Sequence, residues 1–294
     1  MQWRCIEQHI ATVTGKAFKV AQSSNVGGGC INTAFKITGQ DQREYFVKFN
    51  RADRLDMFEA EADGLRELSN AQAVLVPEAI ATGIEGNQAF IIMDYIPFGG
   101  SDRGAMAHFG TQLAQLHQHS SDQYGWHRDN TIGATPQPNH WESDWLSFWR
   151  EHRLGYQLQL AQGNGYSRKA LAKGEQLLDC LEEFFPDSLP PASLLHGDLW
   201  GGNYAVNVSG EPVIFDPAVY YGDREADIAM TELFGGFSHD FYAAYNEAWP
   251  LDEEYKMRKT FYNLYHVLNH FNLFGGGYGA QAEGMMERLL SEVS

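Results

Sequence analysis

Cysteine, long apolar runs and basic charge are all scarce in this sequence of 294 residues. The three cysteines, Cys5, Cys30 and Cys180, are widely spaced and form no CxxC pattern, which argues against a disulfide framework and a structural zinc site. No run of about 18 apolar residues occurs, and the first ten residues lack the apolar core of a signal peptide. We therefore expect a cytoplasmic protein with no membrane association.

Basic residues are also in the minority. The chain has 38 acidic and 21 basic residues, so its formal net charge is −17. Proteins that bind nucleic acids present basic surfaces to the phosphate backbone, so this balance argues against a nucleic-acid partner. An acidic surface is compatible with a cationic amine substrate, but the solubility of a cytosolic enzyme is the preferred explanation of the charge.

The order of predicted elements indicates two lobes. The first part alternates in the manner of strands and contains one helix, over 55–69, after a short opening helix around residues 3–13. Beyond the Pro97–Gly100 segment, helical periodicity dominates over 104–120, 141–161, 169–185, 225–234 and 252–274, and we expect a single hairpin there, 203–207 with 212–215. The pattern predicts an α+β fold with a β-rich lobe, 1–96, a helical lobe, 97–294, and a ligand cleft between them.

The segment His196-Gly197-Asp198-Leu199-Trp200-Gly201-Gly202-Asn203 carries the strongest chemical signal. Asp198 and Asn203 have the D-x₄-N spacing of the kinase catalytic loop. Phosphoryl transfer needs a carboxylate that orients the attacking hydroxyl and accepts its proton, and it needs ligands for the magnesium on the nucleotide phosphates. We predict that Asp198 has the first role and Asn203 the second.

A second magnesium ligand is expected at Asp216, in the sequence Val-Ile-Phe-Asp-Pro. The predicted hairpin returns the chain to its starting point, so Asn203 and Asp216 are expected side by side. Magnesium prefers oxygen ligands from one or two side chains together with phosphates. An isolated aspartate after a strand is more often a turn residue, so the prediction depends on the combination of motifs.

The β-rich part supplies residues suited to a nucleotide. Gly27, Gly28 and Gly29 lie between two predicted strands, where backbone N–H groups can approach phosphates. Lys48 falls within an apolar strand and needs a partner there, because an unpaired buried ammonium is costly. Glu61 on the following helix is the predicted partner, and Glu59 is the second choice.

Residues at the end of the last strand of this lobe occupy the position where kinases bind adenine. Asp94, Tyr95 and Ile96 enter the Pro97–Gly100 hinge. We predict that their backbone groups contact the adenine edge, an assignment that depends on position and not on residue type.

With these motifs in hand, the chain resembles the fructosamine kinase (ketosamine-3-kinase) family, in the aminoglycoside-phosphotransferase branch of the protein-kinase-like superfamily. The resemblance extends over nearly the whole chain. It is carried by the motifs above together with Asn130–Gly133, Pro136–Pro138, Tyr221–Asp227 and Leu268–Tyr278, the last of which generic kinases lack.

The resemblance implies ATP- and Mg²⁺-dependent phosphorylation of a sugar hydroxyl of a ketoamine, a step in deglycation repair. It implies that Asp227 braces the catalytic loop through its backbone, that His196 has a similar structural role, and that Trp200, Asn269 and His270 lie toward the acceptor. HGD and DP replace the HRD and DFG of protein kinases, and no long activation loop follows Asp216. We therefore expect no peptide-binding machinery of the protein-kinase type.

Several alternatives stay open at this level. A kinase for an aminoglycoside, choline or homoserine has the same Asp198, Asn203 and Asp216 pattern, and a nucleotide-binding pseudokinase is a further possibility. His266 and His270 have helical i, i+4 spacing but lack the glutamate of HExxH, which favours a structural role. A redox-linked dimer through Cys30 is a separate hypothesis. The sugar, the amine and the oligomeric state are not specified by the sequence.

Overall fold

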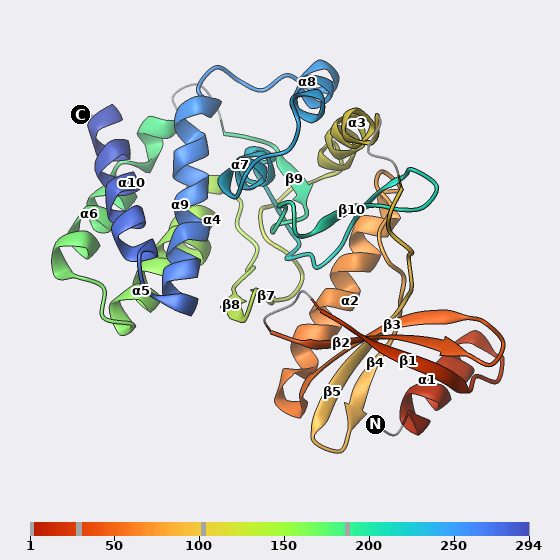
Figure 1. The fold of residues 1–294 in the computed structure, drawn as a ribbon. Coiled ribbons are helices and arrows are strands. Elements are labelled where there is room, and N and C mark those ends of the chain that lie inside the picture. Colours follow the sequence, from red (N-terminus) through yellow and green to blue (C-terminus); the bar gives the residue numbers. More distant parts are fainter. Residues whose placement is uncertain (1–2, 28–30, 101–103, 186–188, 294) are drawn as a thin grey trace. The chain divides into compact units, whose positions relative to one another are not determined.

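The computed structural model describes residues 3–27, 31–100, 104–185 and 189–293. It comprises two compact units, Met1–Asp102 with Ala205–Asp216 and Arg103–Tyr204 with Pro217–Ser294. The first unit therefore includes a segment from within the predicted lobe 97–294, and the lobe boundary at residue 96 stays a prediction. The α+β class expected from the sequence is confirmed, since a β-sheet dominates one unit and helices the other (Figure 1).

The first unit contains a five-stranded antiparallel sheet with the strand order β1-β2-β3-β5-β4. Its strands are β1 (Val20–Val26), β2 (Thr33–Gly39), β3 (Glu44–Arg51), β4 (Ala79–Glu85) and β5 (Gln88–Asp94). Its helices are α1 (Arg4–Thr14), the 3₁₀ turn η1 (Ala52–Arg54) and α2 (Leu55–Asn70). The hairpin of β10 (Tyr204–Val206) and β11 (Pro212–Ile214) makes up most of the second segment of this unit, which begins at Ala205.

Strand alternation assigns the two faces of this sheet different partners. Val47 and Phe49 of β3 pack in one buried cluster with Ile6 and Ile10 of α1. Successive side chains of a strand point to opposite faces, so Lys48, between those two, points away from α1. The apolar pattern of β3 thus determines the direction of its one buried cation.

The second unit is mainly helical. Its helices are α3 (Ala105–His117), α4 (Trp145–Trp149), the π-helical turn η2 (Arg150–Leu154), α5 (Gly155–Gly163), α6 (Arg168–Asp179), the 3₁₀ turn η3 (Leu181–Phe184), α7 (Glu225–Leu233), α8 (His239–Ala248), α9 (Tyr255–Phe274) and α10 (Tyr278–Glu292). Residues 261–269 of α9 are all buried, as expected for a helix that α5, α7 and α10 contact on several sides.

Short strands complete the second unit. β12 (Tyr220–Gly222), β9 (Ala192–Leu195) and β6 (Ser120–Ser121) form a three-stranded antiparallel sheet, and β7 (Asn130–Ile132) pairs with β8 (Thr135–Gln137). The expectation of a single hairpin in this half was therefore wrong. Strands of two to four residues are too short for alternation to distinguish them from loop.

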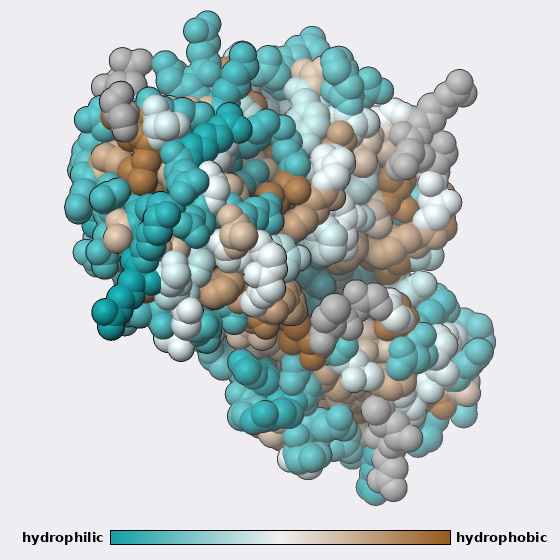
Figure 2. All heavy atoms as spheres, turned by 60° about the vertical axis from the view of Figure 1, so that its left-hand side comes forward, coloured by the Kyte–Doolittle hydropathy of each residue, from teal (hydrophilic) through white to brown (hydrophobic). Residues whose placement is uncertain are grey.

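Most predicted helices and strands are present with altered ends. The helix expected over 169–185 ends at Asp179 and continues as the η3 turn, because Cys180 leaves the helical region of φ/ψ. The sequence prediction omitted α8 and α10. Hydrophilic residues cover much of the face drawn in Figure 2, in agreement with the high acidic content.

Candidate active site

Lys48 is buried in the first unit and forms ion pairs with two carboxylates. Its Nζ donates to Glu61 Oε1 at 2.6 Å and also to a carboxylate oxygen of Asp216. Burial by itself lowers the pKa of this ammonium, but the two carboxylates outweigh that effect, so the net pKa of Lys48 is raised and the side chain stays charged. Burial raises the pKa of Glu61, and the charge of Lys48 opposes this shift.

Asp216 has an unusual backbone. Its φ is +56°, in the left-handed region that non-glycine residues seldom adopt. The preceding residue, Phe215, stacks on Phe98 with ring centroids 5.5 Å apart, and the Ile214 N–H donates to Leu75 O at 3.1 Å. Such backbone strain persists where the surroundings enforce it, and it occurs often at functional positions.

The predicted nucleotide-binding residues that the structure describes in the first unit lie on or beside this sheet. Gly27 directly follows β1, whereas Gly28, Gly29 and Cys30 lie outside the described residues. Asn50 Nδ2 of β3 donates to Asn32 Oδ1 at 2.7 Å, which ties the end of the glycine-rich segment to the strand that carries Lys48.

The hinge residues follow the end of β5. Asp94 Oδ1 accepts from the Glu78 N–H at 2.6 Å, and the Asp94 N–H donates to Glu78 O at 3.0 Å. Lys36 Nζ lies 4.1 Å from the ring centroid of Tyr95. Tyr95 and Ile96 are both partly exposed. Their contact with adenine stays a prediction.

The catalytic-loop motif lies in the second unit, directly after β9. Asn203 Nδ2 donates to Asp198 O at 2.9 Å and to Asp198 Oδ2 at 3.2 Å. The Asp198 N–H points at His196 Nδ1, 3.3 Å away. His196 is fully buried. The D-x₄-N spacing thus corresponds to direct contact between the two side chains, which fixes the orientation of the Asp198 carboxylate.

Gly197 is required by the conformation of this loop. Its φ is +82°, and a Cβ atom there would lie 2.0 Å from the carbonyl oxygen of Ala218. The Ala218 N–H donates to His196 O at 2.8 Å. Only glycine fits such a close approach of two backbone segments. The segment after Asp216-Pro217 is therefore held against the catalytic loop.

Asp227, at the start of α7, binds the backbone of the catalytic loop through its carboxylate. Its Oδ2 accepts from the His196 N–H at 2.7 Å and its Oδ1 from the Gly197 N–H at 2.9 Å. Burial by itself would raise the pKa of Asp227, but these bonds and the neighbouring His117 more than offset it, so the pKa is lowered. The charged carboxylate is the form that this pocket stabilises.

His117 extends this network and was missed as a functional candidate. Its Nε2 lies 3.2 Å from Asp227 Oδ2 and its Nδ1 2.8 Å from the Tyr245 hydroxyl. Burial lowers the pKa of His117, with Asp227 opposing, so we assign a neutral ring that donates from Nε2 and accepts at Nδ1. Arg224 in turn donates to Tyr245 at 3.1 Å. The sequence signal was weak, because His117 is one histidine on a predicted helix.

Two of the predicted acceptor residues belong to one aromatic group. The Trp200 ring lies 6.1 Å from Phe234, and Phe234 lies 4.9 Å from His270. His270 also neighbours the rings of Phe274 and Tyr278. Trp200, Phe234 and Phe274 are each more than a third exposed, so this group presents an accessible aromatic surface in the second unit.

Asn269 is placed differently from Trp200 and His270. It is 3% exposed, its Nδ2 donates to Ile132 O at 3.3 Å, and its Oδ1 accepts from Gln157 Nε2 at 3.4 Å. These contacts tie α9 to the β7–β8 hairpin, which indicates a structural role. Direct contact between Asn269 and an acceptor stays a prediction.

A buried polar network explains the Asn130–Pro138 segment. Gln137 Nε2 donates to Asn130 Oδ1 at 2.8 Å and to Ala218 O at 3.1 Å, while Asn130 Nδ2 donates to Val219 O at 2.8 Å. Tyr265 of α9 donates to Gln137 Oε1 at 2.6 Å. The β7–β8 hairpin thus satisfies the carbonyls that follow Asp216-Pro217 and connects them to α9.

His266 of α9 has the buried surroundings expected for a structural role. His266 is buried, and burial lowers its pKa to about 3. His270 Nδ1 lies 2.8 Å from the His266 carbonyl oxygen, an intrahelical contact.

In the part of the chain that the structure describes, no helix has the length and apolar character needed to cross a membrane.

Comparison with known proteins identifies the family. Residues 2–292 match the family model described as fructosamine kinase. A "Probable ketoamine kinase" of Synechocystis is 46% identical over 98% of this chain and 97% of its own length. A chloroplastic protein-ribulosamine 3-kinase of Arabidopsis thaliana is 43% identical over 94% of this chain and 85% of its own length.

Solved structures agree with this assignment. A crystal structure described as "Putative fructosamine-3-kinase" from Haemophilus somnus has a TM-score of 0.89 at 30% identity, covering 98% of this chain and 97% of that chain. The choline kinase LicA from Streptococcus pneumoniae has a TM-score of 0.62 at 12% identity, covering 98% of each chain, which confirms the predicted protein-kinase-like fold alone. The chain belongs to the fructosamine kinase family.

Proposed function

We propose that this protein transfers the terminal phosphoryl group of ATP to a sugar hydroxyl of a ketoamine, and that it serves deglycation. The family assignment and the names of the relatives, ketoamine kinase and protein-ribulosamine 3-kinase, support the substrate class. The observation that carries the chemistry is the fixed Asp198 carboxylate, held by Asn203 on a loop whose backbone N–H groups bind Asp227.

Asp198 is the proposed catalytic base. It orients the acceptor hydroxyl and accepts its proton as the oxygen attacks phosphorus. Lys48, held by Glu61, neutralises charge on the nucleotide phosphates, and the Gly27–Gly29 backbone contributes N–H donors. Asp94, Tyr95 and Ile96 supply the backbone contacts to adenine. His196 and Asp227 are positioning residues, because they act through the loop.

Magnesium is the proposed metal, with Asn203 and Asp216 as its side-chain ligands. Both offer the hard oxygen donors that Mg²⁺ prefers, and Asp216 is a half-exposed carboxylate in a strained conformation beside Lys48. An ion held by these two residues would supply positive charge against the negative charge of the phosphates during transfer. The amide nitrogen of Asn203 donates to Asp198, which orients the amide group.

The aromatic group of Trp200, Phe234 and His270 is the proposed acceptor surface. Aromatic faces pack well against the apolar faces of sugars, and they attract amine cations. Trp200 lies two residues after Asp198, which places its backbone beside the base. Phe234 was not a candidate from the sequence, because nothing in its local pattern distinguishes it from an apolar core residue.

An ATP-consumption assay with Mg²⁺ tests this function. Fructoselysine and ribuloselysine are compared with choline, an aminoglycoside and no acceptor, using the parent chain, Asp198→Asn and the matched exposed control Glu253→Gln. We expect turnover only with a ketoamine, lost in Asp198→Asn and retained in Glu253→Gln. Turnover only with choline or an aminoglycoside would overturn the substrate class, and ATP binding without any turnover would favour a pseudokinase.

We also propose a cytoplasmic location, supported by the low number and wide spacing of the cysteines. Cys5 and Cys180 are free thiols. Cys30 lies outside the described residues, so a redox-linked dimer through it stays a prediction. Comparison of dimer content with and without a reductant, in the parent and in Cys30→Ser, tests that hypothesis.

A further inference from the structure

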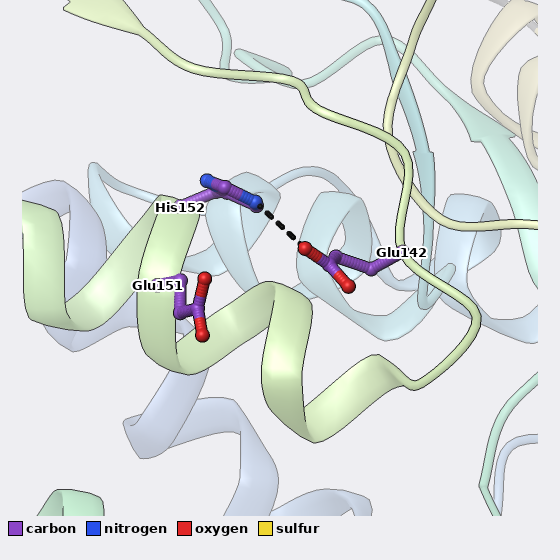
Figure 3. A group of neighbouring side chains, drawn as sticks. All are labelled: Glu142, Glu151 and His152. Atoms are coloured by element: carbon purple, nitrogen blue, oxygen red, sulfur yellow. Dashed lines mark hydrogen bonds and ion pairs between the residues drawn. The ribbon is translucent and has the colours of Figure 1, made fainter.

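We propose a second metal site, for a divalent transition-metal ion of the zinc type, formed by Glu142, Glu151 and His152 in the helical unit. One ligand atom from each of these residues lies within 4.8 Å of the others (Figure 3). None of the three belongs to the phosphoryl-transfer machinery. The site combines one imidazole with two carboxylates, a donor set different from the oxygen ligands proposed for magnesium.

The spacing of the first two ligands suits zinc. His152 Nε2 lies 3.3 Å from Glu142 Oε1. Zinc binds nitrogen and oxygen at about 2.0–2.2 Å, so two ligand atoms around a tetrahedral ion lie about 3.3–3.6 Å apart. The same contact is a hydrogen bond in which the ring nitrogen points at the carboxylate, so both side chains must turn toward an ion that replaces the shared proton. The side chain of Glu151 is exposed and can turn toward the other two ligands.

The backbone positions of Glu142 and His152 are fixed by their surroundings. The Glu142 N–H donates to Tyr124 O and the Tyr124 N–H to Glu142 O, both at 2.9 Å. His152 is buried, and its ring packs on that of Phe148 with centroids 5.5 Å apart. Two ligands held in place lower the entropy cost of metal binding.

A π-helical turn brings the other two ligands to one face. The Gly155 N–H donates to Arg150 O, the i→i+5 bond that defines the η2 turn. A Cβ at residue 155 would lie 2.1 Å from that carbonyl oxygen, so glycine permits the turn. A π-turn has more residues per turn than an α-helix, so consecutive side chains are separated by a smaller angle. Glu151 and His152 can therefore face Glu142 together, and such turns occur often at functional sites.

The charge of the group also favours a cation. Within residues 3–27, 31–100, 104–185 and 189–293, the Glu151 side chain has no hydrogen bond or ion pair, although its carboxylate lies near that of Glu142. A divalent ion satisfies both carboxylates. His140 lies next to the group, its ring centroid 5.2 Å from that of His152, and can serve as a fourth ligand. Imidazole selects zinc-type ions over magnesium.

The test is Zn²⁺ titration of the intact chain without nucleotide, in excess Mg²⁺, against a chromophoric chelator. We expect one Zn²⁺ per chain, with affinity reduced at least about tenfold in Glu151→Gln and in His152→Gln and unchanged in Glu253→Gln. Glu151 is exposed, so its variant is expected to fold normally. When free Zn²⁺ exceeds its dissociation constant tenfold, the folding equilibrium constant should rise by a factor of about 11.

Substitution with Co²⁺ identifies the ligand atoms. We expect visible ligand-field bands of a nitrogen–oxygen site and no thiolate charge-transfer band in the near ultraviolet. A thiolate band would assign the metal to cysteine and overturn the proposal. Failure of Zn²⁺ to bind in excess Mg²⁺, or equal affinity in the parent and Glu151→Gln, would overturn it as well.

Discussion

Replacement of Asp227 by asparagine tests how the catalytic loop is held. The carboxylate accepts the His196 and Gly197 N–H groups, one on each oxygen. An asparagine has a single acceptor oxygen, so its amide nitrogen must face one of these buried donors. The change loses one hydrogen bond to a charged acceptor and leaves a buried N–H unsatisfied, which together cost about 1.5–3 kcal/mol. We expect the free energy of unfolding to fall by that amount.

The assay is urea unfolding followed by tryptophan fluorescence, together with turnover measured without denaturant. Asp198 follows Gly197 directly, so displacement of the loop should lower kcat even where the variant is fully folded. The control Glu253→Gln should change the free energy of unfolding by no more than about 0.5 kcal/mol, and it should leave kcat unchanged. A loss below about 1 kcal/mol with normal kcat would refute the bracing of the loop by Asp227.

The pH dependence gives a second readout of the same residue. The folded-state pKa of Asp227 is below its ordinary value of 3.8. The unfolded chain therefore takes up the proton first as the pH falls. The stability that this carboxylate contributes is fully present above that value and is lost as the pH falls through the lower, folded-state pKa. Asp227→Asn should remove this part of the acid dependence.

Three further predictions concern other buried groups. Lys48→Met leaves Glu61 unpaired, so urea unfolding should show a loss of about 3–5 kcal/mol, partly restored by adding Glu61→Gln; equal losses in both would contradict the pairing. His266 has a pKa of about 3 against 6.5 unfolded, so it should contribute a fall of about 1.4 kcal/mol in unfolding free energy per pH unit between pH 6 and 4, and His266→Gln should remove that contribution. Gly197→Ala should lose more than about 2 kcal/mol of stability, because its Cβ meets Ala218 O; an unchanged melting temperature would exclude this close approach.

The sequence by itself determined the local parts of this protein. Apolar alternation placed Lys48 in a buried strand, where a charge needs a partner, and helix spacing favoured Glu61 over Glu59. The hairpin before Asp216 was also readable, because its turn has the chemistry of Ser209-Gly210. The fold class and the family followed from short motifs of this kind, because the place of each residue in its motif also gives its place in a strand, helix or turn.

Only the tertiary structure decided contacts between distant segments. His117 binds Asp227 across 110 residues, and Gln137 binds the Ala218 carbonyl across 81. Neither partner has a local pattern that predicts the other, because hydrogen-bond geometry depends on how helices and short strands pack. The same holds for the π-turn that aims His152 at Glu142, since helical periodicity does not reveal one inserted residue. The periodicity of a helix or strand can be recognised from neighbouring residues, whereas these contacts join residues that become neighbours only when the chain folds.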